Sequence, residues 1–227
     1  MGCDIHLYTE ILNNKGKWVP NDKWEDNPYN YEEEGDPHRG VHYDNQVWSE
    51  RNYTLFAILA DVRNNYGFAG VNLGNRFNPI SDPKGLPHDV SDEIKGESDR
   101  WGGDGHSHSH LSLSELLNYD WLQVITRRGV VNLDNYKSWR WDKECPESWS
   151  GTVSGGSVKI VEMEEADKLL DASSSSSSSP FTTNWYVNIE WRQLYASCVE
   201  KFPLHTIPLL QEMGKPDEVR IVFWFDN

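Results

Sequence analysis

The chain lacks the features of a membrane or secreted protein. No apolar run approaches the roughly 18 residues of a membrane-spanning helix. No basic segment followed by an apolar stretch occurs near residue 1, so we expect no secretory signal. The three cysteines, Cys3, Cys145 and Cys198, are far apart and form no Cys-x-x-Cys pair, which is typical of a reduced protein. We therefore expect a cytoplasmic location and no membrane partner.

Basic residues are also scarce. The 227 residues include 36 acidic and 21 basic side chains, which gives a formal net charge of −15. Broad binding to nucleic-acid phosphates needs a net basic face, so we do not expect it here. A few arginines can still form a local pocket for a small phosphate-containing ligand. The chain contains no Gly-rich phosphate loop, His-Glu-x-x-His or Gly-x-Ser-x-Gly, so those enzyme classes lose support.

The secondary-structure signals alternate irregularly and predict an α+β fold. We expect a single domain over 1–227, with a mixed, largely antiparallel sheet flanked by short helices and long ordered loops. Residues 173–179 are seven serines, which predict a flexible insertion. Hydrophobic periodicity and turn residues give the main elements. The strands are expected at 2–12, 17–19, 124–126 and 218–226, turns at 13–16 and 127–129, and helices at 52–64, 91–101 and 191–202.

A capping box marks one helix start. Ser112 and Glu115 have the spacing of an N-cap residue and its reciprocal partner, ahead of Leu116 and Leu117. The histidine-rich stretch 106–110 comes directly before this helix. Because a helix N-terminus favours anions, we expect phosphate binding near this junction, with Ser107 and Ser109 as contacts.

The stretch 102–110 carries the strongest signal for chemistry. In an extended chain Asp104, His106, His108 and His110 share one face. Imidazole and carboxylate groups gathered in this way can hold a divalent metal such as zinc, manganese or iron. Asp4 and His6 form a second Asp-x-His pattern on the first strand. The predicted metal ligands are Asp4, His6, Asp104, His106 and His108.

Four further residues complete the predicted site. Arg51 lies just before the first predicted helix and Arg63 lies near its end, and both are expected to hold an anionic substrate. Asp89 lies in a Gly- and Pro-rich loop, and Asp226 closes the last strand. We expect these two carboxylates to act as a general base or as additional ligands.

Several motifs occur together along the chain: Met1-Gly2-Cys3-Asp4-Ile5-His6, Arg51-Asn52-Tyr53, Gly85-Leu86-Pro87 and His106-Ser107-His108. As a set, and over nearly the whole chain, they resemble a family of bacteriophage and prophage proteins. Members typically begin with the same six residues and carry a His-Ser-His-Ser segment. The resemblance implies a phage-encoded protein in the cytoplasm of an infected bacterium, and it implies no particular activity. The resembling proteins have Trp in place of His110, which favours His106 and His108 as ligands.

Two functions fit these residues. The first is a metal-dependent hydrolase of a phosphate ester or nucleotide-type substrate, in which the metal activates water. The second is a non-enzymatic anti-defence protein that sequesters a nucleotide signal or blocks a host defence protein. A third, simpler interpretation leaves the histidines in a solvated loop. Metal content distinguishes the first function from the second.

Overall fold

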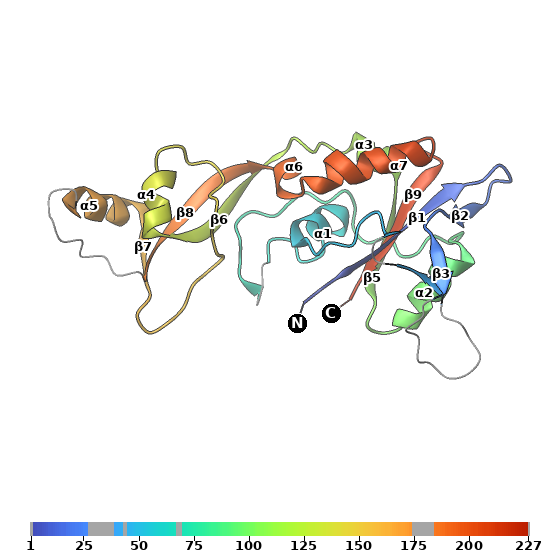
Figure 1. Cartoon of the computed structure of the whole chain (residues 1–227), viewed down its shortest axis with the longest axis horizontal. Coiled ribbons are helices and arrows are strands. Elements are labelled where there is room, and N and C mark those ends of the chain that lie inside the picture. The colour runs from blue at the N-terminus through green and yellow to red at the C-terminus, as the bar shows by residue number, and fades with distance from the viewer. Residues whose placement is uncertain (1, 27–38, 43–44, 67–69, 174–183, 227) are drawn as a thin grey trace. The chain divides into compact units, whose positions relative to one another are not determined.

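The computed structural model of the chain describes residues 2–26, 39–42, 45–66, 70–173 and 184–226 (Figure 1). Residues 174–179 of the predicted polyserine insertion lie outside this part of the chain. The contacts gather in two units: unit 1 comprises 1–64, 78–121 and 199–227, and unit 2 comprises 65–77 and 122–198.

Unit 1 is built on a four-stranded antiparallel sheet of order β2-β1-β9-β5. The strands are β1 (Ile5–Leu12), β2 (Trp18–Pro20), β5 (His106–Ser112) and β9 (Val219–Phe225). All seven residues of β9 are buried, as expected for an apolar strand in the interior of a sheet. Two short strands, β3 (Trp24–Asp26) and β4 (Arg39–Val41), form a separate pair. In Figure 1, β9 lies between β1 and β5.

Short helices follow or cover the strands of unit 1. They are α1 (Tyr53–Ala60), α2 (Asp92–Trp101), α3 (Leu113–Asn118) and α7 (Ile207–Met213), the last preceded by a π-helix, η3 (Phe202–Thr206). The Asn52 side chain caps α1, and Asp61 ends it in the left-handed conformation (φ 57°), so the helix predicted over 52–64 is shorter at its C-terminal end. The capping box of Ser112 and Glu115 is confirmed.

The two faces of the unit 1 sheet pack against different elements. On one face Phe225 contacts Phe56 of α1, with ring centroids 5.0 Å apart. The other face carries Tyr8, Val222 and Trp224, which pack with Ile94 of α2. Residues opposite each other on neighbouring strands share a face, so His6, directly opposite Trp224, lies on this second face.

Unit 2 has a three-stranded mixed sheet of order β6-β8-β7. Here β6 (Val124–Asn132) pairs antiparallel with β8 (Trp185–Leu194), and β7 (Lys159–Glu162) pairs parallel with β8. The helices α4 (Leu133–Trp139), α5 (Met163–Ser173) and α6 (Tyr195–Cys198) each begin directly after a strand.

Two sequence predictions in unit 2 are wrong. The turn predicted at 127–129 is part of the continuous strand β6, because Arg127 is buried with its guanidinium over the rings of Phe77 and Trp149. The helix predicted over 191–202 begins only at Tyr195, because Trp191 continues the period-two burial of Val187 and Ile189 on β8.

The predicted α+β class, with largely antiparallel sheets, is confirmed. The described strands are divided among three sheets rather than gathered in one. Within the described ranges, no helix is long and apolar enough to cross a membrane.

Candidate functional site

The residues predicted from separate stretches of sequence meet at one end of the unit 1 sheet. Phe225 of β9 pairs with Ile5 on one side and with His106 on the other. The segments 4–6 and 106–108 therefore flank the last residues of the same strand. We call this region the β9 end, and define it by residues 4–6, 106–108 and 224–226.

His6 and Asp226 form the central polar pair of the β9 end. His6 Nε2 lies 3.2 Å from Asp226 Oδ2, and both side chains are about one-fifth exposed, at 18% and 19%. The Asp4 backbone N–H donates to Asp226 Oδ1 at 2.8 Å, so the carboxylate is fixed on both oxygens. The His6 ring also packs on Trp101 with centroids 4.1 Å apart. A carboxylate that fixes an imidazole in this way is typical of acid–base sites.

The Asp4 carboxylate is paired with Arg51, and not with another of the predicted metal ligands. Arg51 Nε and Nη2 donate to the two carboxylate oxygens of Asp4 at 2.7 and 2.6 Å. This bidentate hydrogen bonding lowers the pKa of Asp4, against an opposing effect of burial. Both side chains are about half exposed, so a ligand has access to the pair.

The predicted alignment of the histidines on one face is wrong. His106 lies opposite Phe225, and His110 lies opposite Val222. Because Phe225 and Val222 are three residues apart on β9, they face opposite sides of the sheet, and so do His106 and His110. A β-bulge between His106 and Ser109 changes the alternation, and Ser107 in the bulge has a φ of 52°. Asp104 lies in an exposed turn before β5.

His108 follows the bulge and joins the face that carries Trp224. Its ring stacks on Trp224 with centroids 5.6 Å apart and planes at 24°. Its Nε2 lies 2.9 Å from the hydroxyl oxygen of Ser98 on α2. Burial lowers the pKa of His108, and the neighbouring His106 lowers it further.

The two predicted phosphate-binding serines are used within the protein. Ser109 is fully buried and accepts a hydrogen bond from the Lys84 backbone N–H at 3.2 Å. The Ser107 hydroxyl lies 3.0 Å from His106 Nδ1. At the predicted anion-binding helix end, the capping box already occupies the Ser112 and Glu115 N–H groups.

The predicted metal ligands contact different partners in this arrangement. Among the residues that the structure describes, no group of three or more His, Cys, Asp or Glu side chains is placed to hold a metal ion. His6 and His108 both stack on Trp224 and turn their Nε2 atoms to different partners. Metal-bound imidazoles instead converge, with Nε2 or Nδ1 about 2 Å from one ion.

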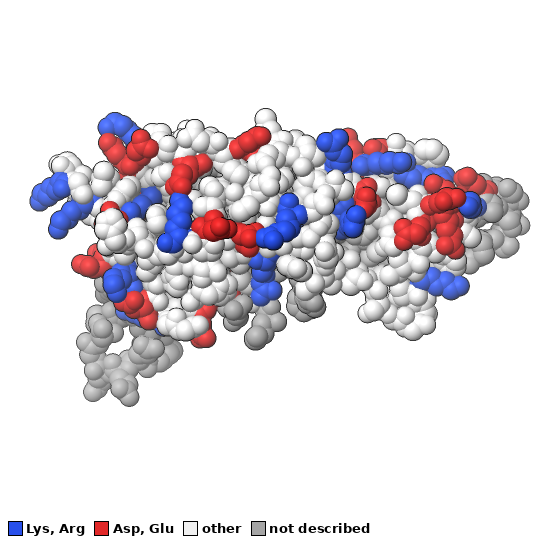
Figure 2. All heavy atoms as spheres, turned by 180° about the vertical axis from the view of Figure 1, so that it is seen from behind, with Lys and Arg blue, Asp and Glu red and all other residues white. Residues whose placement is uncertain are grey.

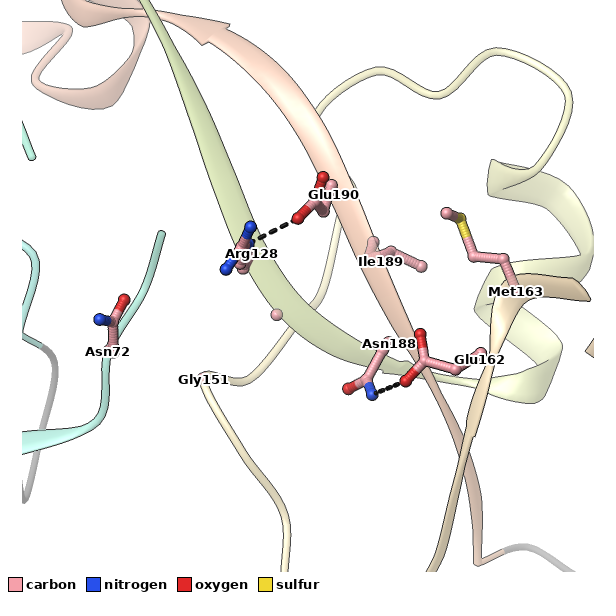
Figure 3. A pocket seen from close by; sticks show the side chains of 9 residues that line it. Asn72, Arg128, Gly151, Glu162, Met163, Asn188, Ile189 and Glu190 are labelled. Atoms are coloured by element: carbon pink, nitrogen blue, oxygen red, sulfur yellow. Dashed lines mark hydrogen bonds and ion pairs between the residues drawn. The ribbon is translucent and has the colours of Figure 1, made fainter. Parts of the chain in front are cut away.

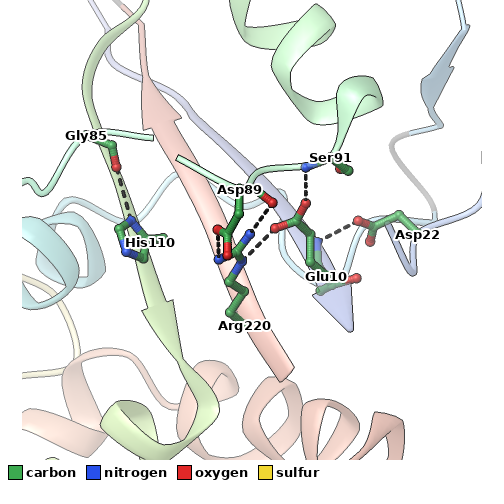
Figure 4. A network of polar contacts seen from close by, with 8 residues as sticks. Glu10, Asp22, Gly85, Asp89, Ser91, His110 and Arg220 are labelled. Carbon is green, nitrogen blue, oxygen red and sulfur yellow. Dashed lines mark hydrogen bonds and ion pairs between the residues drawn. The ribbon is translucent and has the colours of Figure 1, made fainter. Parts of the chain in front are cut away.

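Asp89 belongs to a buried ion-pair network away from the β9 end (Figure 4). Arg220 donates from Nε to Glu10 at 2.7 Å and from Nη1 to Asp89 at 2.8 Å, and the Ser91 N–H also donates to Glu10. Burial raises the pKa of Asp89, but the pairing with Arg220 together with the charge of His88 and a backbone hydrogen bond lowers it, so the net shift is downward. Arg220 precedes Trp224 by four strand residues, about 13 Å along β9. A base role for Asp89 at the β9 end therefore has no geometric support.

A cavity of about 660 Å³ lies beside the ion-pair network and is lined by residues 16–20 and 89–93.

Arg63, the second predicted anion ligand, lies over the ring of Tyr53, with its guanidinium carbon 5.2 Å from the ring centroid, and interacts with Cys3. Burial raises the pKa of Cys3, so this thiol is a poor nucleophile.

Sequence reasoning missed the contribution of α2. This helix brings three residues to the β9 end: Trp101 packs on His6, Ser98 contacts His108, and the charge of Glu97 interacts with His6. Burial raises the pKa of Glu97 against the effect of His6. The spacing 97, 98 and 101 fits one helix face, but nothing in the sequence indicates what that face covers.

Unit 2 has a smaller hollow of about 400 Å³ (Figure 3). Its lining includes two partnered sets, Arg128 with Glu190 and Asn188 with Glu162, and no residue predicted to carry function. On the face drawn in Figure 2, acidic and basic side chains are interspersed over the described surface rather than collected into a basic field.

Comparison with known protein families, curated proteins and solved structures finds no match to this chain. The resemblance to phage proteins stays a prediction.

Proposed function

We propose that the chain is a hydrolase of a phosphate ester or nucleotide-type substrate, and that the β9 end is its active site. The observation that supports this proposal is the pairing of His6 with Asp226 at 3.2 Å, in a partly exposed position. Asp226 fixes the orientation of the imidazole, so His6 is positioned to exchange a proton with the substrate or with water. The proposed reaction uses His6 for proton transfer, and the metal-dependent form of the hydrolase stays a prediction that the EDTA arm of the test distinguishes.

Arg51 provides the anion contact in this proposal. Its guanidinium already binds a carboxylate in bidentate geometry, and a phosphate group presents the same pair of oxygens. A phosphate group that approaches this half-exposed pair replaces the Asp4 carboxylate as the partner of the Arg51 guanidinium. Trp101 is half-buried beside His6 and offers an aromatic surface for a nucleobase.

A second candidate function is non-enzymatic binding of the same ligand class. The specific observation in its favour is that Asp4 and His108 are both engaged in internal contacts, as in a rigid binding site. With the phage resemblance, this candidate is an anti-defence protein that sequesters a nucleotide signal in the infected host. Blocking of a host defence protein is a further form of the same candidate.

The test uses untagged protein with cyclic and linear nucleotides and p-nitrophenyl phosphate esters, with and without EDTA. We expect turnover that persists in EDTA and falls at least about 100-fold in His6→Gln, the usual range for loss of an acid–base group. His205→Gln, on the exposed surface of η3, is the matched control and should retain full activity.

The other results separate the candidates. Turnover that disappears in EDTA and returns with zinc, manganese or iron would support the metal-dependent mechanism. Calorimetric binding of a nucleotide without turnover would favour sequestration. Neither binding nor turnover across the panel would refute both functions.

A further inference from the structure

We infer that Ser98 is a nucleophile of the β9 end and that His108 is its general base; this inference rests on the proposed function. The Ser98 hydroxyl oxygen and His108 Nε2 are 2.9 Å apart, within the range for a nucleophile and its base. The two residues come from α2 and β5, and the sequence shows no Gly-x-Ser-x-Gly or other nucleophile motif around Ser98. Only the fold brings them together.

The packing of His108 suits this role. Its ring is held in place by stacking on Trp224, with ring centroids 5.6 Å apart. Gly105 lies against the same group: a Cβ added there would be 3.1 Å from Trp101, 3.4 Å from Trp224 and 3.5 Å from His108. The imidazole is thus fixed by close packing before any ligand binds.

The two histidines then have separate roles. In a Ser-His-Asp triad one imidazole contacts both the hydroxyl and the carboxylate. Here Ser98 contacts His108, whereas Asp226 contacts His6, and both rings stack on Trp224. This arrangement assigns proton removal from the nucleophile to His108 and proton donation to the leaving group to His6.

The proposed reaction has two chemical steps. Ser98 Oγ forms a bond to phosphorus while its proton moves to His108 Nε2. The bond from phosphorus to the ester oxygen breaks, and this oxygen leaves with the electron pair and takes a proton from His6. Water then attacks phosphorus, gives its proton to His6 and releases Ser98, which recovers its proton from His108.

Ser98 is 6% exposed, so the test uses a small probe. Diisopropyl fluorophosphate labels an activated serine: the oxygen–phosphorus bond forms, the phosphorus–fluorine bond breaks, and fluoride and a proton are released. We expect one label on the native protein, mapped to Ser98 by peptide mass spectrometry. Ser98→Ala should abolish it, and His108→Gln should slow it at least about 100-fold. Ser138→Ala, an exposed serine of unit 2, is the control and should label at the native rate.

Near-UV circular dichroism of each variant shows whether the aromatic packing survives. If Ser98→Ala does not fold, the mapped position of the label on the native protein decides the question. Turnover that needs His6 but survives Ser98→Ala, with no label at Ser98, would overturn this inference and leave the proposed function intact. A label at Ser98 without turnover of any substrate would support the pair and contradict the hydrolase proposal. Neither label nor turnover would refute both.

Discussion

Replacing Arg220 by Met tests the buried ion-pair network of unit 1. The Arg220 side chain is 7% exposed and that of Glu10 is 0% exposed, so the substitution leaves a carboxylate in the interior without its cation. Loss of one partner of a buried pair typically costs about 3–5 kcal/mol. The Ser91 N–H still donates to Glu10, which favours the lower end of this range. Urea denaturation followed by tryptophan fluorescence measures the change in the free energy of unfolding.

Two controls separate burial of the charge from loss of the side chain. The double variant Glu10→Gln/Arg220→Met removes both charges and should be within about 1–2 kcal/mol of the native protein, because a neutral buried pair avoids the desolvation cost. Lys201→Met breaks an exposed pair with Glu50 and should cost less than about 1 kcal/mol. A cost below about 1 kcal/mol for Arg220→Met alone would refute the reasoning.

Asp89→Asn should leave the rate of hydrolysis unchanged, because the Asp89 carboxylate pairs with Arg220 and lies away from the β9 end.

Three further predictions concern single residues. Burial raises the pKa of Asp22 to about 6 in the folded state, above its value in the unfolded chain. As the pH falls, the folded state therefore binds the proton before the unfolded state does, and the free energy of unfolding increases by about 1 kcal/mol from pH 7 to pH 5. Asp22→Asn should lose this gain in urea titrations at the two pH values. Gly105→Ala should destabilise by about 1 kcal/mol in thermal unfolding because its methyl group meets Trp101, whereas Gly103→Ala, with open space around it, should be neutral or slightly stabilising. Ser109→Ala should cost about 1–3 kcal/mol by leaving the Lys84 N–H unpaired, and should not change nucleotide affinity in calorimetry.

Local signals in the sequence were sufficient for much of unit 1. The alternation of residues 2–12, the apolar run at 219–225 and the capping box at 112–115 each depend on neighbours in the chain, and each appears in the structure. The same reasoning failed for β6, where two arginines and a glycine resemble a turn. Burial of Arg127 between aromatic rings is a tertiary effect that no local pattern indicates.

The candidate site was predicted only in part for the same reason. The patterns at 4–6 and 106–108 identify segments that do meet at β9, because both belong to strands that pair with it. The partners of those histidines come from elsewhere: Asp226, which is among the predicted site residues, lies directly after β9, and Ser98, which is not, lies on α2. Such partners follow from strand order and from the placement of α2, and neither is encoded in residue spacing. The metal interpretation expects the histidines to share one ion, and in this structure His6 contacts Asp226 whereas His108 contacts Ser98.

The bulge at Ser107 determines where His108 points, and a deletion tests this role. Two residues, Ser107 and His108, occupy the position opposite Trp224, between the pairs His106 with Phe225 and Ser109 with Phe223. Deleting Ser107 leaves one residue there and restores regular pairing, so we expect β5 to remain paired with β9. The His108 ring should then change its direction relative to α2, and labelling of Ser98 by diisopropyl fluorophosphate should slow at least tenfold. Ser107→Gly is the matched control, because glycine adopts the φ of 52° without strain and keeps the bulge. Native labelling rates in the deletion variant would show that the bulge does not aim His108.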